Sequence, residues 1–447
     1  MKKYLFLAAT AFMFAACSNE EATVPQVAET SPQAVAFDTY MSSATRAYTS
    51  GVMTTALLGD PGFGVFAYHN EGTTSADGAY SYSVGPNFMY DQQVTYGTAW
   101  TYTPIKYWPN ETTKDMHAES GASYSGTPTA TTKNDVLSFF AYAPYVPSST
   151  STTAGTDAGI NEIMANDVDD ADPWVQYTVS KKPSTSVDLV WGVAPAGGLS
   201  YTAVNNNNIS VGQGLPLKNL VKPSKDQKIK FLFQHALARI GMTVVAAVDQ
   251  IAPGGSLDET NTKIFVNSVT LADGATTATI PTYGKLNLNN TSAGVALWDE
   301  KNTDTPFTVT IDATNELNAD LQSSSGTGVT TTEKKVIAQA GTPLKDQYLM
   351  LIPTPGTIGT FDVTIDYDVV TTDASLAAGK STVNNVITKQ ITLNTPSTFS
   401  PGIGGFMNNK AYNLKLILGL TSVKLDAEVA DWEVDGSTNV DLPRNEE

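Results

Sequence analysis

Hydrophobic and polar positions along this chain follow the two-residue period of a β-strand rather than the 3.6-residue period of a helix. Short apolar or alternating runs, separated by clusters of Gly, Asn, Asp, Ser and Thr, continue from about residue 33 towards the C-terminus. Alternation of this kind turns one face of each strand towards a core and the other towards water. The pattern therefore predicts an all-β protein.

Three apolar runs predict the central strands. Residues 62–68 and 136–145 read as buried strands, and the second should stop at Pro144, because proline cannot donate to the ladder. The longest apolar passage, residues 229–248, predicts a strand and its continuation, bent near Gly241. Further strands are expected at 174–179, 187–191, 263–271, 278–288, 307–311, 348–352, 361–370, 386–393 and 412–418. The tract 195–228 is expected to be a long exposed connection.

Two alternating segments lie near the two ends of the chain. The first places a set of four side chains on one side of a strand: Val35, Phe37, Thr39 and Met41. The second, within residues 422–434, alternates in the same way and continues to an aromatic residue: Val423, Leu425, Ala427, Val429 and Trp432. Each set predicts a strand with one buried face, and alternation alone does not say whose sheet that strand completes.

The first 17 residues have the order of an export signal. Lys2 and Lys3 precede an apolar run over residues 4–16, which is shorter than the roughly 20 residues that a membrane-spanning helix needs. This predicts a signal peptide over residues 1–16. The sequence Phe-Ala-Ala before Cys17 resembles the lipobox of bacterial lipoproteins, in which that cysteine carries lipid. The alternative is an ordinary signal peptide that is cut elsewhere.

The amino-acid composition makes one class of binding partner, nucleic acid, improbable. Charged residues make up 16% of the 447 residues and the formal net charge is −18, which argues against nucleic-acid binding, because that function needs a basic surface. Because residues 18–32 hold few large apolar side chains, we expect this tract to form no core of its own and to act as a tether. Cys17 is the only cysteine, so no disulfide within the chain stabilises the fold.

The polar residues form no recognisable catalytic or metal-binding motif. The three histidines, His69, His117 and His235, are far apart in the sequence, and His235 lies in an apolar strand, where a core histidine is expected. Residues 166–172 hold four aspartates but lack the glycine and final glutamate of an EF-hand loop, so an acidic solvated loop is favoured over a calcium site. We expect no enzymatic activity, no metal and no cofactor.

An aromatic-rich segment admits two interpretations. Between residues 88 and 109 the chain holds several aromatic side chains, among them Trp100, Tyr102, Tyr107 and Trp108. Such a density either fills a small core or forms a binding surface, and packing in a core is the favoured interpretation.

Taken together, these features resemble the fimbrillins of Bacteroidetes, the FimA-like and Mfa-like pilins of type V fimbriae. The resemblance rests on five features in order: the leader ending at Cys17, the strand followed by Thr45-Arg46, the Gly-Val-Phe strand at 64–66, the Phe-Gln-His-Ala-Leu-Ala run at 233–238, and Val-Ala-Asp-Trp at 429–432. Long loops between residues 80 and 132 depart from the pattern.

The resemblance implies two β-sandwich-like (transthyretin-like) domains in tandem after a lipoprotein leader. We expect a lipidated tether and propeptide strand over residues 17–46, domains over 47–295 and 296–447, and 195–228 as the competing boundary. An arginine-specific or trypsin-like protease would cut between Arg46 and Ala47 and release the strand around Phe37. A strand from the next subunit, here the segment 422–434, would take its place.

The implied function is a fimbrial subunit for adhesion or biofilm formation, exported to the outer membrane as a lipoprotein. Its partners would be other pilin subunits, the protease, the outer membrane, and a host protein or glycan. Two alternatives are a pilus anchor or tip component, and a permanently anchored lipoprotein that binds glycans through the aromatic-rich segment. Arg46 left uncut, or a C-terminal strand that stays in its own domain, would favour these alternatives.

Overall fold

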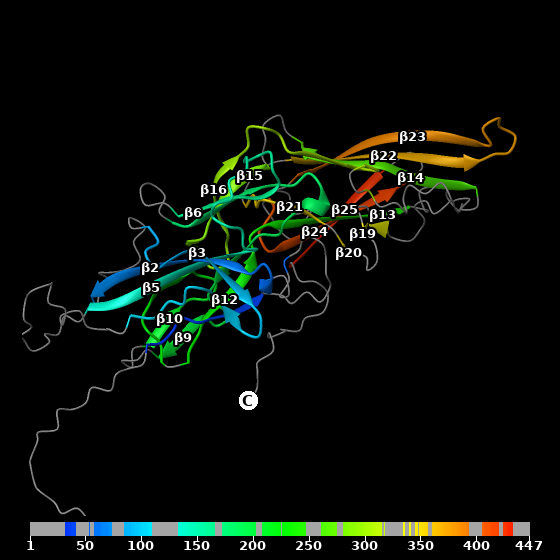
Figure 1. The fold of residues 1–447 in the computed structure, drawn as a ribbon. Helices are drawn as coiled ribbons and strands as arrows, with labels where there is room; N and C mark the ends of the chain where they lie inside the picture. Colours follow the sequence, from blue (N-terminus) through cyan, green and yellow to red (C-terminus); the bar gives the residue numbers. More distant parts are fainter. Residues whose placement is uncertain are drawn as a thin grey trace, which may run out of the picture. The chain divides into compact units, whose positions relative to one another are not determined.

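The computed structural model describes most of the chain after residue 31. Its described residues are 32–41, 53, 58–73, 85–109, 133–165, 172–202, 208–224, 226–246, 261–274, 280–314, 317, 334–335, 339–340, 345–346, 348–355, 360–392, 405–419 and 423–431. Within them the elements are β-strands, apart from a helical turn at Leu58–Gly59 and a 3₁₀ turn at Pro183–Thr185 (Figure 1). The expected all-β class is confirmed.

The largest sheet holds the N-terminal strand at one edge. Its order is β1-β12-β8-β5-β2-β3-β4, and β11 also pairs with β5. The strands of this sheet are β1 (Phe37–Met41), β2 (Phe63–Thr73), β3 (Met89–Tyr96), β4 (Trp100–Thr101), β5 (Lys133–Ala143), β8 (Val190–Val193), β11 (Leu217–Leu220) and β12 (Ile229–His235).

This sheet is buried on both faces, which explains its nearly continuous apolar runs. In β5, Phe139 belongs to the hydrophobic cluster on one face and its neighbour Phe140 to the cluster on the other. Both rings are fully buried. The strand ends at Ala143, directly before Pro144, as the sequence predicts.

Three further sheets carry the rest of the chain. One has the order β18-β13-β24-β25 with β21 paired to β13, another β17-β14-β22-β23, and a third β16-β15-β7-β6. Their strands are β6 (Gly159–Met164), β7 (Trp174–Thr178), β13 (Ala238–Ala246), β14 (Thr262–Asp273), β15 (Tyr283–Asn287), β16 (Leu297–Asn302), β17 (Thr308–Asp312), β18 (Lys334–Lys335), β21 (Leu349–Leu351), β22 (Thr360–Thr372), β23 (Lys380–Thr392), β24 (Lys410–Leu418) and β25 (Val423–Asp431). Two-stranded pairs are β9 (Leu199–Thr202) with β10 (Asn208–Val211), and β19 (Gln339–Ala340) with β20 (Lys345–Asp346).

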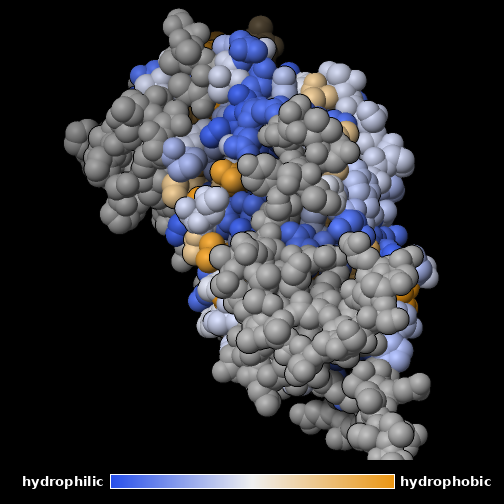
Figure 2. Space-filling model, turned by 90° about the vertical axis from the view of Figure 1, so that its left-hand side faces the viewer, coloured by the Kyte–Doolittle hydropathy of each residue, from blue (hydrophilic) through white to orange (hydrophobic). Residues whose placement is uncertain are grey.

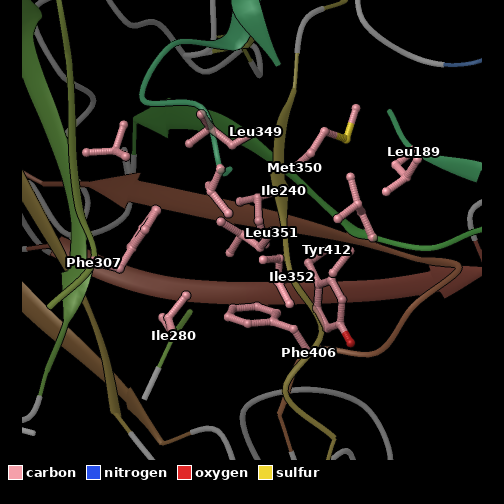
Figure 3. Close-up of a cluster of buried hydrophobic side chains, with 14 of the residues drawn as sticks. Leu189, Ile240, Ile280, Phe307, Leu349, Met350, Leu351, Ile352, Phe406 and Tyr412 are labelled. Atoms are coloured by element: carbon pink, nitrogen blue, oxygen red, sulfur yellow. The ribbon is translucent and has the colours of Figure 1, made fainter. Parts of the chain in front are cut away.

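One hydrophobic cluster connects side chains of these sheets. Figure 3 shows part of it, with Ile240 from β13 near Leu351 from β21, and the ring of Phe406 next to that of Tyr412. The last two rings meet edge to face, with their centroids 5.0 Å apart. Because each sheet turns an apolar face into one shared cluster, burial of that cluster holds the sheets together.

The long apolar passage at 229–248 forms two strands in two different sheets. The change of sheet falls at Ala236 and Leu237, between β12 and β13, so the expected bend near Gly241 is wrong. Gly241 lies inside β13, where a Cβ atom would meet the ring of Tyr348 at 3.2 Å. The glycine therefore serves a close approach between residues and does not mark a turn.

The tract 195–228 is not an exposed connection throughout. It holds β9, β10 and β11, and Leu199, Leu217 and Leu220 are buried. Near the expected domain boundary at residue 295, β15 and β16 pair with one another and β15 also pairs with β7. The division of the chain into domains at that position stays a prediction.

Figure 2 shows one face of the molecule, on which the described residues are mostly hydrophilic and hydrophobic ones are scattered in small groups. None of the described helical residues forms a helix that is long and apolar enough to cross a membrane.

Candidate strand-exchange site

The N-terminal strand β1 fills the edge of the largest sheet. It runs parallel to β12 with Phe37 opposite Ile229 and Met41 opposite Phe233. The alternation expected for this segment is present, since all four inward side chains are buried: Val35 (2% exposed), Phe37 (2%), Thr39 (1%) and Met41 (9%). Because β1 is the last strand in the order of this sheet, its loss would break the ladder with β12 and would not separate two other strands of the sheet.

Phe37 is the main apolar anchor of this strand. Its ring lies 5.5 to 6.1 Å, centroid to centroid, from four aromatic rings: Phe63, Tyr102, Phe139 and Phe231. Three of the four partners come from β2, β5 and β12, so the ring packs against several strands of the same sheet. Aromatic pairs of this kind contribute about 0.5–1.5 kcal/mol each beyond the area that they bury.

A second segment holds the start of the strand from its other side. Val35 N donates to Lys106 O at 2.9 Å, and Trp108 N donates to Gln33 O at 2.9 Å. Ala34 and Tyr107 form an antiparallel bridge between these two bonds. We call the space bounded by β12, residues 106–108 and the four rings around Phe37 the strand slot.

Tyr102 lines one side of the strand slot. Its hydroxyl donates to Val35 O at 2.8 Å, and burial raises the pKa of Tyr102 to about 12. The hydroxyl therefore stays protonated and able to donate across the physiological pH range.

The chain that follows the expected cleavage position is anchored elsewhere. Met53 is buried, and its backbone N donates to Asp188 Oδ2 at 2.8 Å. The same carboxylate oxygen lies 2.8 Å from His235 Nδ1, and both side chains are fully buried. The expectation of a core histidine at 235 is confirmed. Residues 42–52 thus connect β1, which is held in the strand slot, to a separate attachment point at Met53.

The segment expected to act as a donor strand forms β25 in this structure. Val423 to Asp431 pair antiparallel with β24, with Leu425 opposite Leu416 and Val429 opposite Tyr412. Within the described strands β25 has one neighbour, so it also lies at a sheet edge. Val423 is buried. Donation of this strand to another subunit stays a prediction.

Several expected site residues lie outside the described residues: Cys17, Arg46, Ala47 and Trp432. Of the acidic segment at 166–172, the structure describes Asp172, which accepts hydrogen bonds from Asn287 (3.3 Å) and Asn289 (3.0 Å). Among the described residues no group of three or more His, Cys, Asp or Glu side chains is placed to hold a metal ion.

The four aromatic residues considered for glycan binding do not form one exposed surface. Tyr102 and Trp108 are buried, and Trp100 is half-buried against Phe63 and Tyr96. Tyr107 is 51% exposed. Most of this segment therefore packs around the strand slot, which is the interpretation that the sequence favours.

A buried carboxyl group lies on β3 of the same sheet. Asp91 is 5% exposed, and its Oδ1 accepts a hydrogen bond from the Tyr142 hydroxyl at 2.7 Å. Burial raises the pKa of Asp91 to about 7, although hydrogen bonds from Tyr142 and Ser148 oppose the shift. The charged form of this side chain is therefore disfavoured in the folded protein.

We expect Asp91→Asn to remove a pH dependence of stability. Because the pKa of Asp91 is raised on folding, the protonated side chain contributes to the free energy of unfolding, and this contribution is fully present below about pH 4. As the pH rises towards 7 the contribution is lost, which lowers the free energy of unfolding by about 4 kcal/mol at most. The variant should be more stable than wild type at pH 8, and the difference in stability between the two proteins should be smaller at pH 4. Asparagine also suits the φ of +44° at this position.

Urea unfolding at the two pH values measures this difference. Asp226→Asn, at an exposed position whose φ is +68°, is the matched control. Equal gains for Asp91→Asn at pH 4 and pH 8 would contradict the prediction.

The comparisons with known proteins show that the fold is shared with one solved fimbrial protein. No protein-family model and no curated protein matches the sequence. A fimbrial protein from Bacteroides vulgatus superposes with a TM-score of 0.53 at 20% identity, over 90% of this chain and 99% of that one. This similarity shows a shared fold, in agreement with the fold expected from the resemblance to the fimbrillins.

Two other solved structures are more distant. A protein from Bacteroides uniformis proposed to act in cell adhesion gives a TM-score of 0.40 at 13% identity, over 89% of this chain and 98% of that one. The tip fimbrial protein Mfa3 from Porphyromonas gingivalis, truncated at its C-terminus, gives 0.28 at 9% identity, over 83% and 99%. TM-scores this low do not establish a shared fold.

Proposed function

We propose that this protein is a structural subunit of a surface fimbrium, assembled by exchange of the strand that fills the slot beside β12. The observation that carries the proposal is the placement of β1. An arginine-containing connection follows it, and the chain is anchored again at Met53. The fold shared with a fimbrial protein from Bacteroides vulgatus supports the same function. The subunit acts by binding its own kind, without enzymatic activity.

Export precedes assembly in this proposal. The leader directs the chain across the inner membrane, and Cys17 receives the lipid that holds the precursor at the outer membrane. In the precursor, β1 occupies the strand slot and keeps the edge of the sheet closed. A closed edge prevents premature association during transit, because an open edge with an apolar wall pairs with other chains.

A cut between Arg46 and Ala47 then separates the strand from the body of the molecule. After the cut, β1 is held by its ladder to β12, the bonds to residues 106–108 and the packing of Phe37, and by no covalent link. The downstream chain keeps its attachment through Met53 and Asp188. Loss of β1 exposes unpaired backbone groups and an apolar wall, which a strand from the next subunit covers. Head-to-tail repetition of this contact gives a filament.

Arg46→Ala tests the proposal directly. The variant should stay a lipid-anchored monomer on the cell surface, whereas the wild type forms high-mass polymers that resist dissociation. Arg46→Lys is the informative control, because a trypsin-like protease still cuts it and an arginine-specific protease does not. Native gels and size-exclusion chromatography of surface extracts give the readout. Polymer formed by Arg46→Ala at the wild-type level would contradict the proposed activation.

A further inference from the structure

A lysine, an asparagine and an aspartate form a hydrogen-bonded row between two sheets. Lys218 Nζ donates to Asn289 Oδ1 at 3.0 Å, and Asn289 Nδ2 donates to Asp172 Oδ1 at 3.0 Å. Lys218 belongs to β11 of the largest sheet, whereas Asp172 precedes β7 and Asn289 follows β15, which are neighbours in another sheet. The side-chain amide of Asn289 therefore has an amine on one side and a carboxyl group on the other.

The pairing of β7 with β15 holds the aspartate beside the asparagine. Leu288 N donates to Pro173 O at 2.9 Å, which continues the antiparallel ladder beyond the start of β7 and the end of β15. In this register Asp172 is opposite Asn289, and Asn289 N donates to Asn287 Oδ1 at 2.8 Å. The carboxyl group and the amide are therefore held together by the backbone as well as by their own hydrogen bond.

A buried asparagine holds the chain before the lysine to the same segment. Asn290 is 1% exposed, and its Nδ2 donates to Gly214 O at 3.0 Å, four residues before Lys218. Its Oδ1 accepts a hydrogen bond from Trp191 Nε1 at 3.3 Å, so both ends of the side-chain amide are bonded. Because Asn290 adjoins Asn289, these bonds limit how far the amine and the amide can move apart.

The row supplies the groups that aminolysis of an amide needs. A neutral lysine amine is a nucleophile, and a positioned carboxyl group can transfer protons to and from the reacting nitrogens. The oxygen that Lys218 contacts is bonded to the carbon to be attacked, and the nitrogen that Asp172 contacts is the one that leaves. Holding the three groups together replaces an encounter in solution, and each molecule needs to react only once.

We infer that Lys218 and Asn289 become joined by an isopeptide bond, with Asp172 as the residue that transfers the protons. The product is a secondary amide between Nζ of the lysine and Cγ of the asparagine, and one ammonia is released. The hydrogen-bonded row is the arrangement that precedes this bond. The inference goes beyond the proposed function and does not require it.

The reaction balances without another reactant. Lys218 first loses its ammonium proton and Asp172 gains one, and water carries it because both side chains are partly exposed. The neutral Nζ attacks Cγ, so a nitrogen–carbon bond forms and the carbonyl electron pair moves to Oδ1. Asp172 gives its proton to the amide nitrogen and takes one from the attacking nitrogen. The old carbon–nitrogen bond then breaks, the carbonyl re-forms and ammonia leaves, and nothing is oxidised or reduced.

The bond closes a loop that contains one wall of the strand slot. Lys218 and Asn289 are 71 positions apart, and the chain between them includes β12 and β13. A covalent link of this span restricts the unfolded chain in the way that a disulfide does. Cys17 is the only cysteine, so no disulfide within the chain can serve this purpose. The isopeptide bond therefore ties the largest sheet to its neighbour.

The mass of the intact chain tests this inference. One isopeptide bond lowers the mass by one ammonia, about 17 Da, relative to the mass calculated from the sequence and the N-terminus found in the same sample. We expect this loss in the wild type, and trypsin should release a joined peptide in which the segment containing Lys218 is attached to residues 286–301. Wild-type protein of full mass with no joined peptide would overturn the inference.

Four variants assign the loss to these residues. Lys218→Arg keeps the positive charge but not the amine, and Asn289→Ala removes the amide, so both should show the full mass calculated for the variant. Asp172→Asn should leave most chains unlinked, because an amide does not exchange protons as a carboxyl group does. The matched control is Asn287→Ala: Asn287 Nδ2 also donates to Asp172, at 3.3 Å, but its amide is not the one that Lys218 contacts, so the loss should remain.

A succinimide is the competing source of the same loss. An asparagine can lose ammonia when the following backbone nitrogen attacks its side chain, which joins no two segments. A loss that persists in Lys218→Arg, or that occurs without the joined peptide, would identify this reaction and overturn the inference. The mass can be read on monomer and polymer alike, so failure of the proposed fimbrial assembly would leave the expected loss unchanged.

Discussion

Phe37→Ala should lower the free energy of unfolding of the uncut precursor by about 3–5 kcal/mol. The ring is 2% exposed and packs against four other aromatic rings, so its removal leaves a large cavity that rigid neighbours cannot fill. Unfolding in urea, followed by tryptophan fluorescence on the unlipidated precursor carrying Arg46→Ala, measures the loss. Processed polymers should be unaffected, because the residue is removed with the strand.

Thr39→Ala is the matched control for this prediction. The two residues lie on the same face of β1, but the buried Thr39 hydroxyl has no hydrogen-bond partner, so its removal should cost less than about 1 kcal/mol. If both variants lose the same stability, the aromatic packing of Phe37 is not the main anchor of the strand.

The chain that begins at Ala47 should be far less stable as a monomer than the precursor. It lacks the buried Val35, Phe37 and Met41, each worth about 1.5–3 kcal/mol, which makes a loss of roughly 5–9 kcal/mol. It also exposes the backbone groups of β12 that β1 satisfied. Thermal unfolding of the two chains, at a concentration too low for assembly, measures the difference.

A peptide of residues 33–42 added in trans should restore much of this stability. The peptide can rebuild the ladder with β12 and the packing around its Phe37, so the transition should move to higher temperature as its concentration rises. The same peptide with Phe37→Asp is the control and should give no shift. Equal stability of the two chains without peptide would mean that β1 does not support the fold.

Local pattern predicted much of this fold because many strands have their own hydrophobic signature. β22 and β24 alternate buried and half-buried positions along most of their length, and β5 carries a mostly apolar run over residues 136–143 that ends before a proline. These signals lie within the strand itself, so the sequence is sufficient to find them.

The strands and partners that the sequence missed depend on distant contacts. β9 to β11 are four residues each, too short to show a period, although Leu217 pairs with Phe139 of β5. The change of sheet between β12 and β13 follows from their different partners and has no local turn signal. Gly241 suggested a bend, but in the structure this glycine lies inside a strand and allows the Tyr348 ring to approach closely.

The same limit applies to the strand slot. The alternation of residues 35–41 predicts a buried face, but the rings around Phe37 come from residues 63, 102, 139 and 231, which no local pattern connects. The pairing of Asp188 with His235 likewise joins residues 47 positions apart. Only the fold brings them together and shows that the chain is anchored on both sides of residues 42–52.

The central claim is that a cut after Arg46 frees the strand slot for assembly. The most direct test is the N-terminal sequence and intact mass of the protein isolated from the cell surface. We predict a chain that begins at Ala47, carries no lipid and occurs in high-mass polymers. A monomeric chain that begins at an acylated Cys17 and retains residues 17–46 would contradict this account and would indicate a permanently anchored lipoprotein.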